Sequence, residues 1–156
     1  MPVDLFKSYR HAPPHLFRAG AIYMLTAHIY DQHPLIEESA RKEDWATAFL
    51  RSASIYRWTV HAWVVLDTHY HVIVQAPKED ASGLPRFVSS YHKYTGRKWN
   101  QEDQTPGRRV WWNYWDTCVK SEIEYRNRMN YIYRNPVKHG AVNTPSEYRF
   151  ISLRSR

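Results

Sequence analysis

The sequence predicts an α+β fold in which helices pack on a mostly antiparallel sheet. Four segments carry the composition of strands, and three longer segments place apolar side chains at helical spacing. Their order is strand, helix, strand, strand, helix, strand, helix, which suits a split β-α-β arrangement. The chain of 156 residues has the length of one domain. We therefore interpret residues 1–156 as a single domain.

The four predicted strands are rich in aromatic and β-branched residues and end at turn-forming residues. They cover residues 21–30, 57–66, 69–75 and 110–120. Asp67 and Thr68 form a two-residue turn between the second and third strands, which predicts a hairpin. Pro77 ends the third strand.

The three predicted helices combine helical spacing of apolar residues with recognisable ends. They cover residues 37–54, 84–98 and 121–135. In the last helix, Ser121 is the expected N-cap, because Glu124 follows at capping-box spacing. Pro136 is expected to end this helix, since proline disfavours helical geometry at the residue before it. Residues 1–18 are interpreted as an N-terminal arm and residues 141–156 as a C-terminal tail.

The composition points to a polyanionic partner. The formal net charge is +7 and the pI is about 9.6, which favours nucleic acid. An anionic membrane surface is the competing interpretation, but no clean basic amphipathic helix supports it. Cys118 is the single cysteine, so no intrachain disulfide can form. With no signal-peptide core at the N-terminus and no apolar run of membrane length, we expect a cytoplasmic protein.

His69 and His71 are the first candidate site residues. Side chains alternate along a strand, so these two imidazoles project from one face and Tyr70 from the other. Two histidines supply part of a metal site. Without a nearby cysteine, the remaining ligands would be oxygens, which for phosphate chemistry favours Mg²⁺ or Mn²⁺. The simpler alternative is that one imidazole is only a packed or surface residue.

Tyr131 stands out among twelve tyrosines because of its place on the last helix. At about 100° per residue, Tyr125, Met129 and Ile132 form the buried stripe, and Tyr131 lies well off it. Asn135 follows one turn later on the same face as Tyr131 and could donate an amide oxygen to a metal. The alternatives are a surface or base-stacking tyrosine and an ordinary asparagine before proline.

Basic and aromatic residues interleave in three stretches of the second half of the chain. Cations that follow phosphates and aromatic planes that stack on bases are typical of single-stranded nucleic acid binding. The candidate DNA-binding residues are Arg97, Arg108, Arg109, Trp111, Arg128, Arg134 and Lys138. Alternate tryptophans would face the core of the sheet, and we expect this of Trp112 or Trp115.

Two of these motifs resemble a known family. The segment from Trp63 to Leu66 that leads into His69-Tyr70-His71 resembles the HUH motif, in which two histidines flank a hydrophobic residue. The segment 131–140, YIYRNPVKHG, resembles the tyrosine-helix signature of the REP-associated tyrosine transposases. These proteins are related to the small single-tyrosine insertion-sequence transposases. The resemblance runs from about residue 21 to about residue 152.

The resemblance implies a ferredoxin-like core, the HUH endonuclease core, and cleavage of single-stranded DNA near hairpins. By position it makes Tyr131 the nucleophile, His69 and His71 metal ligands, and Asn135 the third ligand. The expected enzyme is a transposase that forms a 5′-phosphotyrosine with Mg²⁺ or Mn²⁺ as cofactor. The expected partner is single-stranded DNA with hairpin or palindromic repeats, and a homodimer is left open. The alternatives are a hairpin-binding module without catalysis and a domesticated protein that acts on host repeats.

Overall fold

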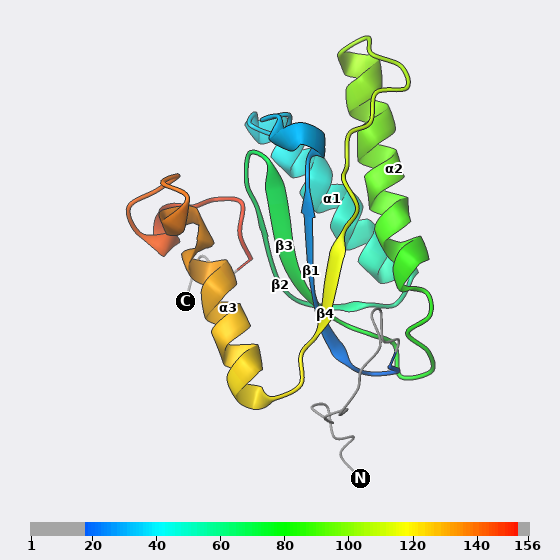
Figure 1. The fold of residues 1–156 in the computed structure, drawn as a ribbon, viewed down its shortest axis with the longest axis vertical. Helices are drawn as coiled ribbons and strands as arrows, with labels where there is room; N and C mark the ends of the chain where they lie inside the picture. Colours follow the sequence, from blue (N-terminus) through cyan, green and yellow to red (C-terminus); the bar gives the residue numbers. More distant parts are fainter. Residues whose placement is uncertain (1–17, 153–156) are drawn as a thin grey trace.

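The computed structural model describes residues 18–152. Its elements in chain order are β1 (Ile22–His28), α1 (Ser39–Ile55), β2 (Thr59–Val65), β3 (His69–Gln75), α2 (Leu84–Glu102), β4 (Trp115–Cys118) and α3 (Glu122–Lys138) (Figure 1). Two short 3-10 turns, η1 and η2, cover Tyr30–Gln32 and Pro145–Glu147. The predicted α+β class is confirmed. The predicted N-terminal arm falls on residues 1–18, which lie outside the described residues except for Arg18.

The four strands form one sheet in the order β2-β3-β1-β4, and all neighbouring pairs are antiparallel. With helices packed on it, this sheet is the predicted ferredoxin-like arrangement. The turn at Asp67 and Thr68 joins β2 to β3, and the Leu66 N–H donates to the His69 carbonyl at 2.8 Å. β4 is shorter than the predicted strand 110–120, because only Trp115–Cys118 pair continuously with β1. Upstream of β4, an isolated bridge joins Trp111 to Ile29.

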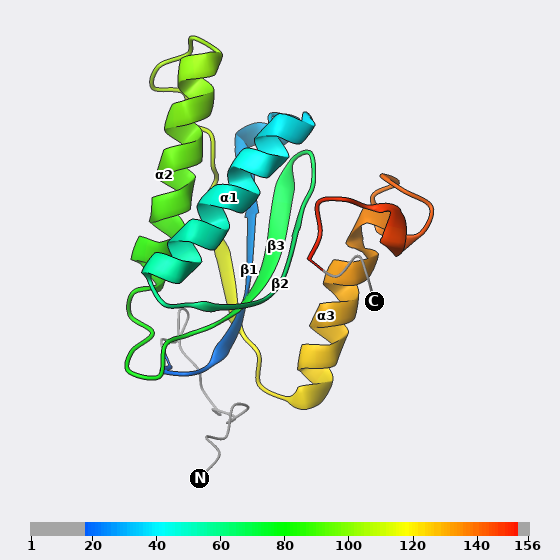
Figure 2. The same ribbon diagram turned by 180° about the vertical axis from the view of Figure 1, so that it is seen from behind.

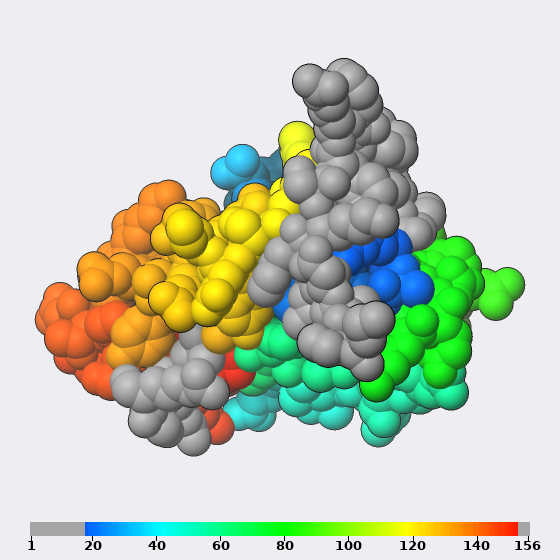
Figure 3. Space-filling view, turned by 90° about the horizontal axis from the view of Figure 1, so that it is seen from below, coloured from blue at the N-terminus to red at the C-terminus, as the bar shows by residue number. Residues whose placement is uncertain are grey.

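Helices cover both faces of the sheet, and each face has its own core. α1 and α2 lie against one face, and α3 lies against the other (Figures 1 and 2). Viewed from below, the yellow and orange surface of α3 lies on the opposite side of the molecule from the green surface at the start of α2 (Figure 3). The larger core, on the α1 and α2 side, contains the fully buried aromatic residues Trp45, Phe49, Tyr70, Phe87, Tyr91 and Trp99. The smaller core, under α3, contains Ile22, Met24, Val64, Ile73 and Ile132.

The start of α3 is confirmed, but its predicted end is wrong. Ser121 Oγ accepts from the Glu124 N–H at 3.0 Å, and the Glu124 carboxylate accepts from the Lys120 N–H at 3.1 Å. The helix then continues through Pro136 to Lys138. Proline removes one N–H from the last turn, while the His139 N–H still donates to the Asn135 carbonyl at 3.0 Å. The loss of a single hydrogen bond near the end is tolerated, and Pro136 is buried there.

The chain after α3, within the predicted tail, packs along the free edge of β2. The Val65 N–H donates to the Phe150 carbonyl at 3.1 Å, and the Ser152 N–H donates to the Trp63 carbonyl at 3.0 Å. Tyr148 is buried, and its hydroxyl donates to the Val65 carbonyl. These contacts cover an edge that would otherwise expose unpaired backbone groups. No helix in the described part of the chain is long and apolar enough to span a membrane.

Candidate active site

The histidine pair lies on the sheet face that α3 covers. His69 and His71 are 6% and 5% exposed, and both belong to β3. Tyr70 points to the opposite face, where its ring packs against Trp45 at a centroid distance of 4.7 Å. The predicted alternation is therefore confirmed. The two imidazoles are neighbours, with ring centroids 5.0 Å apart.

Hydroxyl groups orient both imidazoles. His71 Nδ1 lies 2.7 Å from the Thr26 hydroxyl on β1, and His69 Nδ1 lies 3.0 Å from the Thr68 hydroxyl in the turn. In both rings the hydroxyl contact is made by Nδ1, and Nε2 is the ring nitrogen that does not take part in it. The buried His71 Nε2 has no hydrogen-bond partner among the described residues. A buried polar atom without a partner is costly, so this nitrogen is suited to bind a ligand.

Burial keeps both histidines neutral near pH 7. It lowers the pKa of His69 to about 4 and the pKa of His71 to about 3, and repulsion from neighbouring imidazoles adds to both shifts. A neutral imidazole offers a lone pair, which is the state that coordinates metals. The site therefore favours two neutral imidazoles, which can bind a ligand, over two positively charged ones.

Two further histidines, which the sequence did not single out as site residues, surround His69. His28 stacks on His69 with centroids 4.9 Å apart, because the two residues are register partners in β1 and β3. His139, just after α3, meets His69 edge-on at a centroid distance of 4.9 Å. The sequence signal for His28 was weak, since nothing local pairs the end of the first strand with the start of the third.

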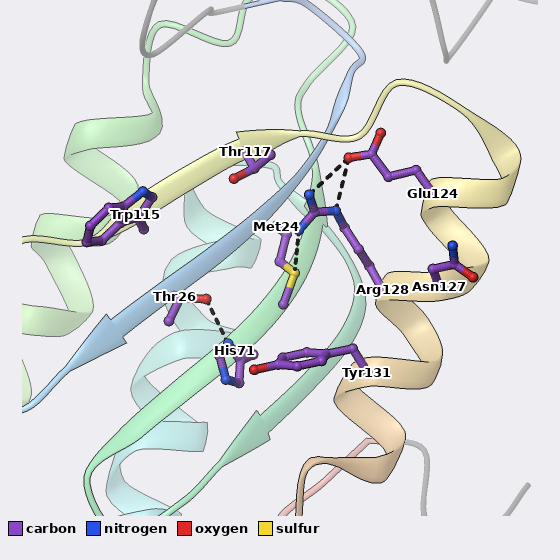
Figure 4. A pocket seen from close by; sticks show the side chains of 9 residues that line it. All are labelled: Met24, Thr26, His71, Trp115, Thr117, Glu124, Asn127, Arg128 and Tyr131. Carbon is purple, nitrogen blue, oxygen red and sulfur yellow. Dashed lines mark hydrogen bonds and ion pairs between the residues drawn. The ribbon is translucent and has the colours of Figure 1, made fainter. Parts of the chain in front are cut away.

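Tyr131 reaches this site from α3. Its ring lies 5.1 Å from that of His71, nearly perpendicular to it, and points from the helix toward β3 (Figure 4). Tyr131 is 39% exposed, whereas Ile132 beside it is fully buried, so the predicted separation from the buried stripe is confirmed. Lys138 Nζ lies 5.1 Å from the Tyr131 ring centroid, which adds positive charge next to the phenol.

Asn135 completes the group of predicted ligands. It is fully buried, and neither its Oδ1 nor its Nδ2 has a hydrogen-bond partner among the described residues. Its amide still acts on His69, where it opposes part of the lowering of the pKa. No three His, Cys, Asp or Glu residues in the described part of the chain form a metal-binding group. A metal at the histidine pair would therefore need a ligand of another type, and the Asn135 amide oxygen fits that requirement.

An open pocket of about 510 Å³ lies between β4 and α3, beside Tyr131 and His71 (Figure 4). Met24, Thr26 and Thr117 line it from the sheet, and Arg128 lines it from α3. Arg128 is held by two bonds to Glu124 Oε1, at 3.1 and 3.0 Å, and by Met24 Sδ at 3.2 Å. The predicted DNA-binding residue Arg128 thus faces the pocket as half of an ion pair.

The other predicted DNA-binding residues lie in two places. Arg134 and Lys138 are exposed on α3 and line a second pocket near the end of that helix. Arg97 and Arg108 line a pocket of about 550 Å³ on the α2 side of the molecule. Arg109 lies nearby, with its guanidinium 4.3 Å from the Trp112 ring. The structure therefore does not bring the predicted cations into one surface.

The assignments of the tryptophans require correction. Trp111 is only 8% exposed, stacks on His92 and donates from Nε1 to the Thr95 hydroxyl at 3.0 Å. It is a core residue and is not placed to stack on bases. Trp112 and Trp115, of which one or the other was expected in the core, are 45% and 72% exposed. Residues 112–114 are irregular, so the strand predicted over 110–120 is interrupted. The alternation of inward and outward side chains expected along it therefore does not hold.

The antiparallel sheet with helices on both faces is the α+β fold that the resemblance implies. An antiparallel sheet presents paired histidines to a tyrosine on a helix. No protein-family model matches the chain. Comparison with curated proteins and solved structures nevertheless identifies relatives.

The chain is 31% identical over 93 residues to the REP-associated tyrosine transposase of Escherichia coli K12. That match covers 58% of this chain and 52% of the relative, so the chain spans about half of that protein's length. A Haemophilus influenzae protein, provisionally given the same name, is 24% identical over 145 residues, which cover 88% of this chain and 82% of the relative. A solved structure of a REP-associated tyrosine transposase bound to a REP hairpin superimposes on this chain with a TM-score of 0.72, at 22% sequence identity. The superposition covers 94% of this chain and 82% of the solved chain. The resemblance to the REP-associated tyrosine transposases is confirmed.

Proposed function

We propose that this chain is a metal-dependent single-stranded DNA endonuclease and transposase that cleaves and rejoins DNA at hairpins through a 5′-phosphotyrosine. The observation that carries the proposal is the placement of Tyr131, which projects from α3 to within 5.1 Å of the His71 ring. The ring lies over the buried, neutral His71 although the side chain is partly exposed, which places the phenol next to a possible metal ligand. The kinship with named transposases supports the same activity.

His69, His71 and Asn135 would hold the metal. The partnerless His71 Nε2 and the partnerless Asn135 Oδ1 support this assignment, because each atom has a lone pair that a cation can bind. A donor set of nitrogen and oxygen suits Mg²⁺ or Mn²⁺ in phosphate chemistry. When bound, the cation would withdraw charge from the scissile phosphate.

Tyr131 is the nucleophile in this proposal. Its phenol oxygen forms a bond to phosphorus while the bond between phosphorus and the 3′ oxygen breaks, and the phenol proton is balanced by protonation of the released 3′ oxygen. Lys138 Nζ, 5.1 Å from the Tyr131 ring centroid, would offer positive charge to the phosphate under attack. The product is a 5′-phosphotyrosine and a free 3′-hydroxyl. The same hydroxyl, or another, can attack the phosphotyrosine and rejoin the strand, because the bond energy is conserved.

Hairpin DNA is the proposed substrate. The chain carries a net charge of +7, and the solved relative is bound to a REP hairpin. Exposed cations and exposed tryptophans both occur near the proposed site and on the α2 side. These features suit a strand with unpaired bases better than a uniform duplex.

The test is formation of a covalent adduct. End-labelled hairpin DNA with single-stranded flanks is incubated with Mn²⁺ and resolved on a denaturing gel. Wild type should give a protein–DNA band that Tyr131→Phe lacks, while hairpin binding remains within about twofold because the lost hydroxyl is exposed. Tyr133→Phe on the same helix is the matched control and should keep the band. If wild type binds the hairpin and yields no adduct, the chain is a binding module without catalysis.

A further inference from the structure

The pocket between β4 and α3 extends beyond the reacting groups, along a line of neighbouring residues on the sheet. Trp115 on β4 is the register partner of Thr26 on β1, and Thr26 is the register partner of His71 on β3. Adjacent strands are about 4.8 Å apart, so Trp115 lies two strands, or about 10 Å, from His71. One nucleotide spans that distance between its phosphate and its base.

Trp115 contributes little to the core, because most of its side chain is exposed. It is 72% exposed on a four-residue edge strand, and it forms one wall of the pocket (Figure 4). Such a ring offers a flat surface on which any base can stack.

The opposite wall carries polar groups that are held in place. Glu124 and Arg128 form an ion pair, and Met24 Sδ fixes the other end of the guanidinium. Because the pair largely neutralises itself, this part of the pocket suits an uncharged polar base edge better than a phosphate. Asn127, one residue before Arg128, also lines the pocket and adds an amide with both donor and acceptor atoms.

We propose that this pocket binds one unpaired base next to the scissile phosphate, and that it selects the nucleotide at which the strand is cut. Trp115 stacks on the base, and Asn127 with the Glu124–Arg128 pair reads its edge. The proposal deepens the proposed endonuclease function and rests on it. It names specificity residues in this chain, in the same pocket that His71 and Tyr131 line.

The test measures binding, so that it does not depend on cleavage. In a Tyr131→Phe background, affinity is measured for a hairpin oligonucleotide whose single-stranded flanks carry one abasic site, moved through each position. One position should weaken binding by about 5- to 100-fold, the effect of one lost stacked base. That penalty should vanish in Trp115→Ala and persist in Trp115→Phe. Trp112→Ala, which removes an exposed indole from a different pocket, should also retain it.

Base identity is then varied at the sensitive position. Asn127→Ala removes an exposed side chain that folding does not need, and it should reduce the preference among the four bases. The proposal is overturned if the abasic site weakens binding equally with and without the indole of Trp115. It is also overturned if no position is sensitive to an abasic site, or if Asn127→Ala keeps the same preference among the four bases. Failure of the endonuclease proposal looks different, since it is the lack of a covalent adduct in wild type.

Discussion

Asn135 lies in a position where function and stability should conflict. Its two amide atoms are buried without partners among the described residues, directly beside His69. Each such atom loses its hydration on folding at a cost of about 1–3 kcal/mol, which the interaction of the amide with His69 offsets only in part. Leucine has a similar size and no polar atom. Asn135→Leu should therefore stabilise the metal-free protein by about 2 kcal/mol, which raises Tm by roughly 4–8 °C in a domain of this size.

The assay is thermal and urea unfolding in excess chelator, followed by the same measurement with Mn²⁺. Metal at 100 times its Kd should stabilise wild type by about 2.7 kcal/mol. The Leu variant has lost a ligand, so Mn²⁺ should stabilise it much less. The difference in free energy of unfolding between the two proteins should therefore narrow or change sign. Asn130→Leu is the matched control, because Asn130 is exposed on the same helix and reports only the better helix propensity of leucine.

The reasoning fails if Asn135→Leu is less stable than wild type in chelator once the control is subtracted. The surroundings would then stabilise the amide in the metal-free protein, and its atoms would not need a ligand to offset their burial. An equal response of both proteins to Mn²⁺ would remove Asn135 from the metal site while leaving the stability argument intact. The two parts of the prediction can therefore be judged separately.

The remaining predictions concern the histidines, the helix cap and the core. His69→Ala and His71→Ala should each abolish the covalent adduct seen in the denaturing gel. His61→Ala is the control, because His61 contacts only side chains outside the site. It should retain the adduct and lose about 1 kcal/mol of stability. A surviving adduct in either of the first two variants would contradict their role. Ser121→Ala should reduce the free energy of unfolding by about 1 kcal/mol through the lost cap, measured in urea, and an unchanged midpoint would show that the cap is dispensable. Trp45→Ala should cost about 3–5 kcal/mol because the indole is fully buried, and a loss under 1 kcal/mol would mean that the larger core is not centred there.

Local patterns predicted the parts of the site that depend on one element alone. The period of two on a strand put His69 and His71 on one face, and the helical period separated Tyr131 from the stripe around Ile132. Both periods follow from backbone geometry, which does not depend on the rest of the fold. The capping serine was predictable for the same reason.

Features that need a partner element were beyond the sequence. The stacking of His28 on His69 depends on the register between β1 and β3, which no local signal fixes. The exposure of Trp115 depends on the place of β4 at the edge of the sheet, and the burial of Trp111 depends on contacts with α2. Aromatic residues serve equally well in cores and on binding surfaces, so their composition alone could not separate these roles.

Among the described residues, buried side-chain atoms without a hydrogen-bond partner occur singly at Trp45 and Thr105 and together at His71 and Asn135. On the α1 and α2 side, the Tyr70 hydroxyl pairs with Tyr91 and His92, whereas Trp45 Nε1 is a single buried atom without a partner. On the α3 side, His71 and Asn135 keep partnerless atoms within one small region. A fold selected only for stability would fill that region with apolar side chains, as it does around Ile73 a few residues away. The grouping of these atoms supports the proposed metal site, and it directs the first experiments to α3 and its facing strand.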